Sequence, residues 1–130
     1  MSSAVRRIEV TGRARPETAW ERYADLTLWS SWSPQIRSVE ADGPRLAVGR
    51  SGVVRVVGGL GVPFVVTALD ADLMTWSWIA RVGPVALTLH HDLSPAPPGT
   101  TAGLVLEGPS LLVAAYGPLT RLPLARLVRP

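Results

Sequence analysis

Apolar and polar positions alternate through the middle of the chain, which predicts a sheet of short consecutive strands. Segments rich in Val, Leu, Ile and Trp recur at residues 35–42, 52–57, 62–72, 73–81, 84–93 and 100–108. Turn-forming stretches such as GGLG, VGP and SPAPPG separate them. Connections this short leave no room for the helices that join parallel strands, so we predict an antiparallel sheet.

The two ends of the chain depart from this alternation. Residues 5–12 predict a first strand. In PETAWERYAD the apolar residues have helical spacing, and Pro16 suits the first turn of a helix. Leu26–Ser33 adds a further helical turn, which ends before Pro34. Helical spacing returns at Ser110–Tyr116, and the later prolines predict a kinked, frayed continuation.

A strand, two short helices, six more strands and a final helix predict an α+β fold in a single domain, residues 1–130. A curved antiparallel sheet of about seven strands cannot cover its own concave apolar face. We therefore expect the C-terminal helix to pack on that face. Together they would enclose a hydrophobic cavity.

Composition removes several classes of function. The chain has no Cys and only two His, so we predict neither a metal site nor a cofactor. All 13 basic residues are Arg, spread without a dense run, so we do not expect nucleic-acid binding. This Lys-free composition is typical of a GC-rich bacterial genome. No signal peptide or membrane span is recognisable, so we expect a cytoplasmic protein without stable membrane insertion.

The stretch PETAWERYADLTLWSSWSPQIRSVE resembles the START-like (SRPBCC) superfamily, specifically its polyketide cyclase/dehydrase-like branch. There a Pro-Glu pair opens the first helix, an Asp ends it, and a Trp-x-Pro step leads into I-x-x-V-E. The matching positions are Pro16, Glu17, Trp20, Asp25, Trp32, Pro34, Ile36, Val39 and Glu40. Further on, LMTWSW resembles the family's Leu-x-x-Trp strand, and LSPAPPGTT resembles its Leu-x-Pro … Gly-Thr hairpin. The resemblance spans nearly the whole chain and implies the helix-grip fold, although the final helix here is shorter than usual in the family.

The candidate ligand-binding residues are mostly aromatic. Met74, Trp76 and Trp78 are two residues apart and would share one face of a strand. If that face is concave, they line the cavity, where flat rings suit an apolar or aromatic ligand; otherwise they fill the core. Trp32 belongs to the Trp-x-Pro step and would seal one end of the cavity. Trp29 has no such counterpart and is expected at the cavity mouth or at a partner surface.

His91 is the candidate catalytic residue. Its parity along the strand with Leu89 places both side chains inward, whereas His90 would face solvent. An imidazole in an apolar pocket could act as an acid or base, orient a ligand carbonyl, or simply pack in the core. On the final helix, Leu112 and Tyr116 are expected to close the cavity, with the Tyr116 hydroxyl at its mouth. Thr67 or Thr75, together with Ser77, are further candidate polar groups inside the pocket.

Three functions remain open. The first is binding of a small hydrophobic molecule that is lipid-, polyketide- or aromatic-like. The second is a polyketide aromatase/cyclase or dehydratase with His91 as acid/base, for which the pocket has few polar groups. The third is a non-catalytic interaction protein or homodimer, suggested by the positive mean hydropathy. The superfamily includes both carriers and enzymes, so the resemblance does not choose among these functions.

Overall fold

The computed structural model describes residues 2–130 and contains seven strands in one sheet. The strands are β1 (Ser3–Gly12), β2 (Ile36–Ala41), β3 (Ser51–Val56), β4 (Gly61–Asp70), β5 (Thr75–Val82), β6 (Val85–Ala96) and β7 (Gly99–Pro109). The helices are α1 (Pro16–Ala24), η1 (Leu26–Leu28), α2 (Trp29–Trp32), α3 (Ser110–Tyr116), η2 (Gly117–Thr120) and α4 (Arg121–Leu127), where η marks a 3₁₀ turn. This element order confirms the predicted α+β fold.

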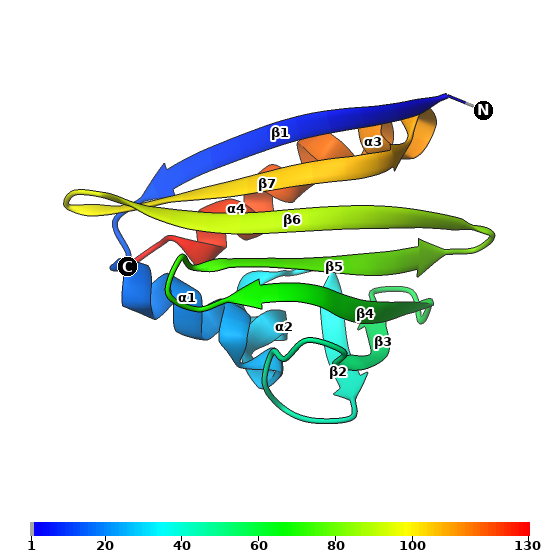
Figure 1. Ribbon diagram of the computed structural model, residues 1–130, viewed down its shortest axis with the longest axis horizontal. Helices are drawn as coiled ribbons and strands as arrows, with labels where there is room; N and C mark the ends of the chain where they lie inside the picture. Colours follow the sequence, from blue (N-terminus) through cyan, green and yellow to red (C-terminus); the bar gives the residue numbers. More distant parts are fainter. Residues whose placement is uncertain (1) are drawn as a thin grey trace.

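The sheet is antiparallel throughout and runs in the order β1-β7-β6-β5-β4-β3-β2 (Figure 1). From β2 to β7 each strand pairs with its neighbour in sequence, as short hairpin connections require. β1 pairs instead with β7, from Ser3 opposite Pro109 to Gly12 opposite Thr100. The first strand therefore lies beside the strand that leads directly into the C-terminal helices.

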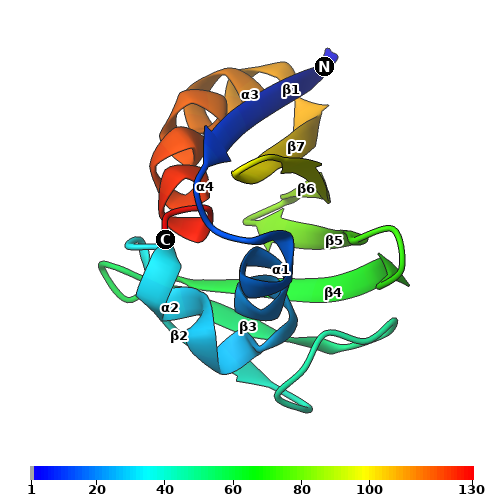
Figure 2. The same ribbon diagram turned by 90° about the vertical axis from the view of Figure 1, so that its left-hand side faces the viewer.

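All helices lie on the concave side of the curved sheet (Figure 2). The predicted kink in the C-terminal helix is confirmed, because α3 and α4 are separated by the 3₁₀ turn at Gly117–Thr120. Beyond the kink the chain is not frayed. The Arg22 guanidinium of α1 donates to the carbonyl oxygens of Leu127 at 2.7 Å and Arg129 at 2.6 Å. Because the last carbonyls of a helix have no partner within it, this arginine caps α4 and fixes it against α1.

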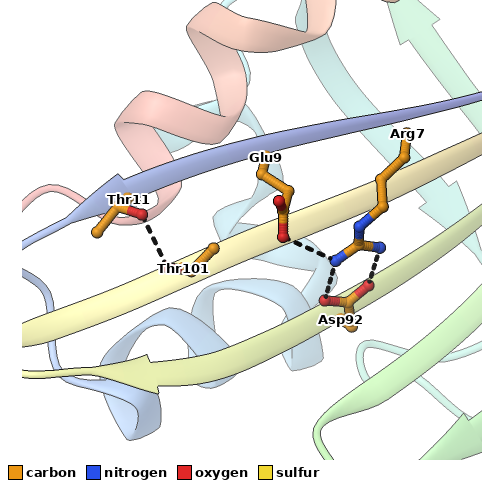
Figure 3. Close-up of polar contacts among 5 residues, drawn as sticks. All are labelled: Arg7, Glu9, Thr11, Asp92 and Thr101. Carbon is orange, nitrogen blue, oxygen red and sulfur yellow. Dashed lines mark hydrogen bonds and ion pairs between the residues drawn. The ribbon is translucent and has the colours of Figure 1, made fainter.

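The outer, convex face of the sheet carries polar side chains that pair across strands (Figure 3). Arg7 on β1 reaches over β7 and binds Asp92 on β6 through two hydrogen bonds of 2.9 and 3.1 Å, and it also donates to Glu9. Gly103 on β7 makes this crossing possible, since a Cβ atom there would collide with the Arg7 guanidinium and the Asp92 carboxylate. Across β1, β7 and β6 the outer face therefore carries a network of polar contacts, whereas the concave face is apolar.

Candidate functional site

A cavity of about 290 Å³ lies between the concave face of the sheet and the helices. Its walls come from α1, α2, the segment from Ser33 to Ile36 at the start of β2, the inner positions of β3 to β7 and the C-terminal helices. Most of the lining side chains are aliphatic or aromatic, and none of those described is Arg, Asp or Glu. The volume is near the lower end of the roughly 300–1,000 Å³ that is typical of small-molecule sites.

Trp76 and Trp78 of β5 form the centre of an aromatic wall. Their ring centroids are 5.7 Å apart, and both also lie close to Trp29 of α2, at 5.5 Å and 5.2 Å respectively. Tyr23 of α1 approaches Trp76 edge-on at 5.4 Å. Edge-on and tilted contacts at these distances are the arrangements that aromatic rings prefer. The β5 tryptophans thus project into the cavity, as strand alternation predicts.

The two tryptophans of α2 cap the C-terminal end of α1 through hydrogen bonds. The indole nitrogen of Trp29 donates to the carbonyl oxygen of Tyr23 at 2.8 Å, and that of Trp32 donates to the carbonyl of Arg22 at 2.9 Å. Both carbonyls belong to the last turn of α1, where no partner exists within the helix. Pro34 follows and prevents the short α2 helix from continuing.

The expectation that Trp29 lies at the mouth or at a partner surface is wrong. Its side chain is 1% exposed, against 8% for Trp32, and it packs among Trp32, Phe64, Trp76 and Trp78. The physical reason is the hydrogen bond from the Trp29 indole nitrogen to the last turn of α1, which holds the ring inside the core. Sequence spacing alone did not reveal this hydrogen bond.

His91 lies on the cavity wall, as its strand parity predicts. It is 8% exposed and stacks on Trp76, with ring centroids 4.0 Å apart and planes 5° from parallel. Burial lowers the pKa of His91 to about 3. The imidazole is therefore neutral at pH 7, where it can donate or accept a hydrogen bond but is a weak base.

Leu112 and Tyr116 of α3 and Leu89 of β6 also line the cavity. The Tyr116 hydroxyl lies 3.5 Å from the Gln35 side-chain nitrogen, and burial raises the pKa of Tyr116. Met74 does not line the cavity. It lies in the turn before β5 with φ of 54°, so the alternation that carries Trp76 and Trp78 inward does not extend back to it.

Thr67, Thr75 and Ser77 were expected as polar groups in the pocket, and none of them lines it. Thr75 and Ser77 alternate with Trp76 and so point to the outer face, while Thr67 is exposed beside the register shift of β4. The sequence analysis instead missed lining residues from the β3–β4 hairpin. These are Val54, Val56, Leu60 and Val62. Arg55 is exposed between two of these valines and pairs with Glu40, so strand alternation around this arginine could have placed Val54 and Val56 on the inner side.

Comparisons of the fold agree with this architecture. A crystal structure of Ara h 8.0201 matches with a TM-score of 0.79 at 14% identity, covering 97% of this chain and 95% of that one. Protein MLL2253 from Mesorhizobium loti matches with a TM-score of 0.72 at 20% identity, covering 88% and 84% of the two chains. A protein from Nitrosospira multiformis matches with a TM-score of 0.74 at 18% identity, covering 95% and 93%. At these identities the likeness shows the fold alone.

Comparison of the sequence with curated proteins finds no match. In the part of the chain that the structure describes, no helix has the length and hydrophobicity to cross a membrane. The family model described as "Polyketide cyclase / dehydrase and lipid transport" matches residues 1–129. The START-like resemblance, which spans nearly the whole chain, is thereby confirmed, and the chain belongs to the polyketide cyclase/dehydrase and lipid transport family.

Proposed function

We propose that the protein binds a small, hydrophobic, partly aromatic molecule in the cavity that Trp76 and Trp78 line. The observation that supports this most is the wall itself, in which several aromatic rings surround an apolar space of about 290 Å³. Apolar surface that enters this space leaves water and gains contact with flat rings. A compact ring system or a short acyl chain suits the volume better than a long-chain lipid.

The test uses N-phenyl-1-naphthylamine, a neutral probe whose fluorescence increases in apolar surroundings. Ala80 on β5 lines the cavity, so Ala80→Phe would place a ring in the binding space. Ala68 on β4 is exposed, so Ala68→Phe is a matched control. We expect Ala80→Phe to weaken probe binding at least tenfold and Ala68→Phe to leave it unchanged. Equal binding by both variants would place the probe elsewhere and reject the proposal.

Catalysis is the second candidate function, and one observation favours it: the Nδ1 atom of His91 is buried in the cavity wall without a partner among residues 2–130. A pKa of about 3 makes this imidazole a poor proton acceptor near neutral pH. Binding is therefore the primary proposal. Native mass spectrometry of the purified protein would identify a co-purified ligand. Loss of its turnover in His91→Gln, with binding retained, would support the cyclase or dehydratase alternative.

The homodimer hypothesis stays a prediction. The apolar surface that bears on it is the outward side of the C-terminal helices, where Leu111, Leu119 and Leu122 are exposed. Native mass spectra recorded over a range of protein concentrations would reveal a dimer if this surface associates with a second copy.

A further inference from the structure

The outward side of the C-terminal helices is almost entirely apolar. Between Ser110 and Val128 the exposed positions recur every three or four residues, so they share one side of the helical segment. Leu111 is 87% exposed, Leu119 67% and Leu122 55%. We call this side the outer helical face. Its exposed side chains are Leu111, Ala114, Ala115, Pro118, Leu119, Arg121, Leu122 and Ala125.

The inward side of the same helices is apolar as well. Val113, Leu124 and Leu127 are buried in the core, and Leu112 and Tyr116 line the cavity. A helical segment that is apolar on both sides is normally covered on both sides. A contiguous exposed apolar surface on a folded domain marks a site of interaction. The composition of the outer helical face therefore indicates that something outside this chain covers it.

The charge of this segment is positive and uncompensated. Residues 108–130 contain Arg121, Arg126 and Arg129 and no Asp or Glu. None of the ion pairs among residues 2–130 involves these three arginines, whereas five others, such as Arg45, each pair with a carboxylate. Arg121 is exposed within the outer helical face, and Arg129 is exposed at the end of the segment. An anionic surface would therefore complement this face.

A second exposed apolar group lies at the tip of the β3–β4 hairpin. Val57 is 66% exposed and Leu60 is 59% exposed, and residues 57–60 carry no charge. Leu60 also lines the cavity, together with Tyr116 and Thr120 of the C-terminal segment. The cavity therefore reaches the surface beside Leu60, between an uncharged hairpin tip and the C-terminal helices.

A second copy of the chain suits the outer helical face poorly. In a two-fold symmetric contact the same surface meets itself. The arginines of the two copies would then lie close together, and no acidic side chain within either outer helical face could compensate them. Apart from Arg121, the face also has no exposed hydrogen-bonding side chain that would fix the orientation of a protein partner. A lipid bilayer needs no such fixed orientation.

We propose that the outer helical face docks on the surface of an anionic lipid bilayer. Leu111, Leu119 and Leu122 enter the boundary between headgroups and acyl chains, and Arg121 contacts lipid phosphates. Helical surfaces that combine leucines with arginines bind anionic membranes in this way without crossing them. The proposal goes beyond ligand binding, because it concerns the outer surface of helices whose inner side lines the cavity.

The test is sedimentation of the purified protein with sucrose-loaded vesicles. One set contains phosphatidylglycerol and phosphatidylcholine in equal amounts, and the other contains phosphatidylcholine alone. We expect binding at least about tenfold stronger to the anionic set, and weaker binding at high salt. The double variant Leu119→Gln/Leu122→Gln should lower the partition coefficient at least about tenfold. Arg121→Gln should lower it about fivefold, the effect of one cation near an anionic surface.

Two matched controls lie away from this face. Leu73, in the turn before β5, is 68% exposed, and Arg81 on β5 is exposed. Leu73→Gln and Arg81→Gln should leave vesicle binding unchanged. Circular dichroism and urea unfolding establish that each variant is folded. Neither Leu119 nor Leu122 lines the cavity, so their double variant should bind N-phenyl-1-naphthylamine normally when no vesicles are present.

The outcomes separate this inference from the proposed function, because probe binding in the cavity and vesicle binding are measured independently. Failure of the wild type to bind anionic vesicles would overturn the inference, and so would equal binding by the wild type and the Leu119→Gln/Leu122→Gln variant. Equal binding to both sets of vesicles would also overturn it, because the arginines would then have no role. A dimer that the same double substitution dissociates, without vesicle binding by the wild type, would assign the face to a second copy instead.

Discussion

His90 and His91 are adjacent in β6, yet they have opposite surroundings. His90 lies on the outer face, half-exposed, and both its ring nitrogens have partners: Nδ1 lies 2.8 Å from the Ser77 hydroxyl and Nε2 lies 2.7 Å from the Glu107 carboxylate. His91 lies on the inner face, buried against Trp76, with Nδ1 unpaired. Strand alternation alone separates them, because successive side chains point to opposite faces of a sheet.

On the outer face both ring nitrogens of His90 find partners among neighbouring polar side chains. Ser77, His90 and Glu107 lie on three adjacent strands and form a continuous hydrogen-bonded line. On the inner face aromatic rings surround His91, and its Nδ1 atom has no partner among the described residues. Among the described residues, the buried unpaired polar atoms therefore lie on the inner side of the sheet and on α1, which packs against it.

The largest expected difference between the two faces concerns packing in β5. Trp76→Ala removes a ring that contacts Tyr23, Trp29 and His91. We expect it to lower the free energy of unfolding by about 3–5 kcal/mol, as for other buried aromatic residues replaced by Ala. Ser77→Ala, at the next position but on the outer face, should cost less than about 1 kcal/mol. Urea unfolding of both variants measures the difference, and equal costs would contradict the two-face description.

A pH titration sharpens the contrast between the histidines. The folded pKa of His91 is about 3, below the value of about 6.5 for an unfolded chain, so between these values the unfolded state binds more protons. Stability is full above pH 6.5 and falls by about 1.4 kcal/mol per pH unit as the pH drops toward 3. His91→Phe cannot titrate and can still stack on Trp76. Relative to this variant, the wild type should lose about 2–3 kcal/mol between pH 7 and pH 4.5.

The control for this titration is His90→Gln, which alters the neighbouring ring without changing the buried one. Unfolding by urea is measured at each pH for the wild type and both variants. The His90→Gln protein should keep the acid-dependent loss that His91 causes. If His91→Phe and the wild type lost stability in parallel, burial would not hold the imidazole of His91 neutral.

The fold could be predicted almost completely from the sequence. Turn residues such as Gly58 and Gly59, which adopt positive φ, mark the ends of strands, and Pro16, Pro34 and Pro118 mark where helices begin, end or kink. These are local constraints, which a single sequence displays directly. The element order then leaves few ways to cover an apolar concave face.

The site could be predicted only where alternation was clear. Trp76, Trp78 and His91 were placed correctly because each lies within a long regular strand. Met74 was misplaced because it lies in a turn, where the alternation of β5 does not apply. Trp29 was misplaced because its position depends on a hydrogen bond to the end of α1, six residues earlier. Contacts between elements of this kind have no periodic signature in the sequence.

The smallest expected effect concerns the ion pair between Arg7 and Asp92, and tests whether its contribution to stability is coupled to Gly103. Arg7 and Asp92 are partly exposed, so breaking their ion pair by Arg7→Ala should cost less than about 1 kcal/mol. Gly103→Ala should cost a similar amount in the wild type, because its Cβ atom would displace both groups. In the Arg7→Ala background the same substitution should be neutral or stabilising, since no described residue other than Arg7 holds the Asp92 side chain over Gly103, and Ala suits a strand better than Gly. A double-mutant cycle, measured by urea unfolding, should therefore give a coupling of about 0.5–1 kcal/mol. Additive effects would mean that the Arg7–Asp92 ion pair does not depend on the glycine. The order of the outer face would then come from the backbone hydrogen bonds between the strands alone.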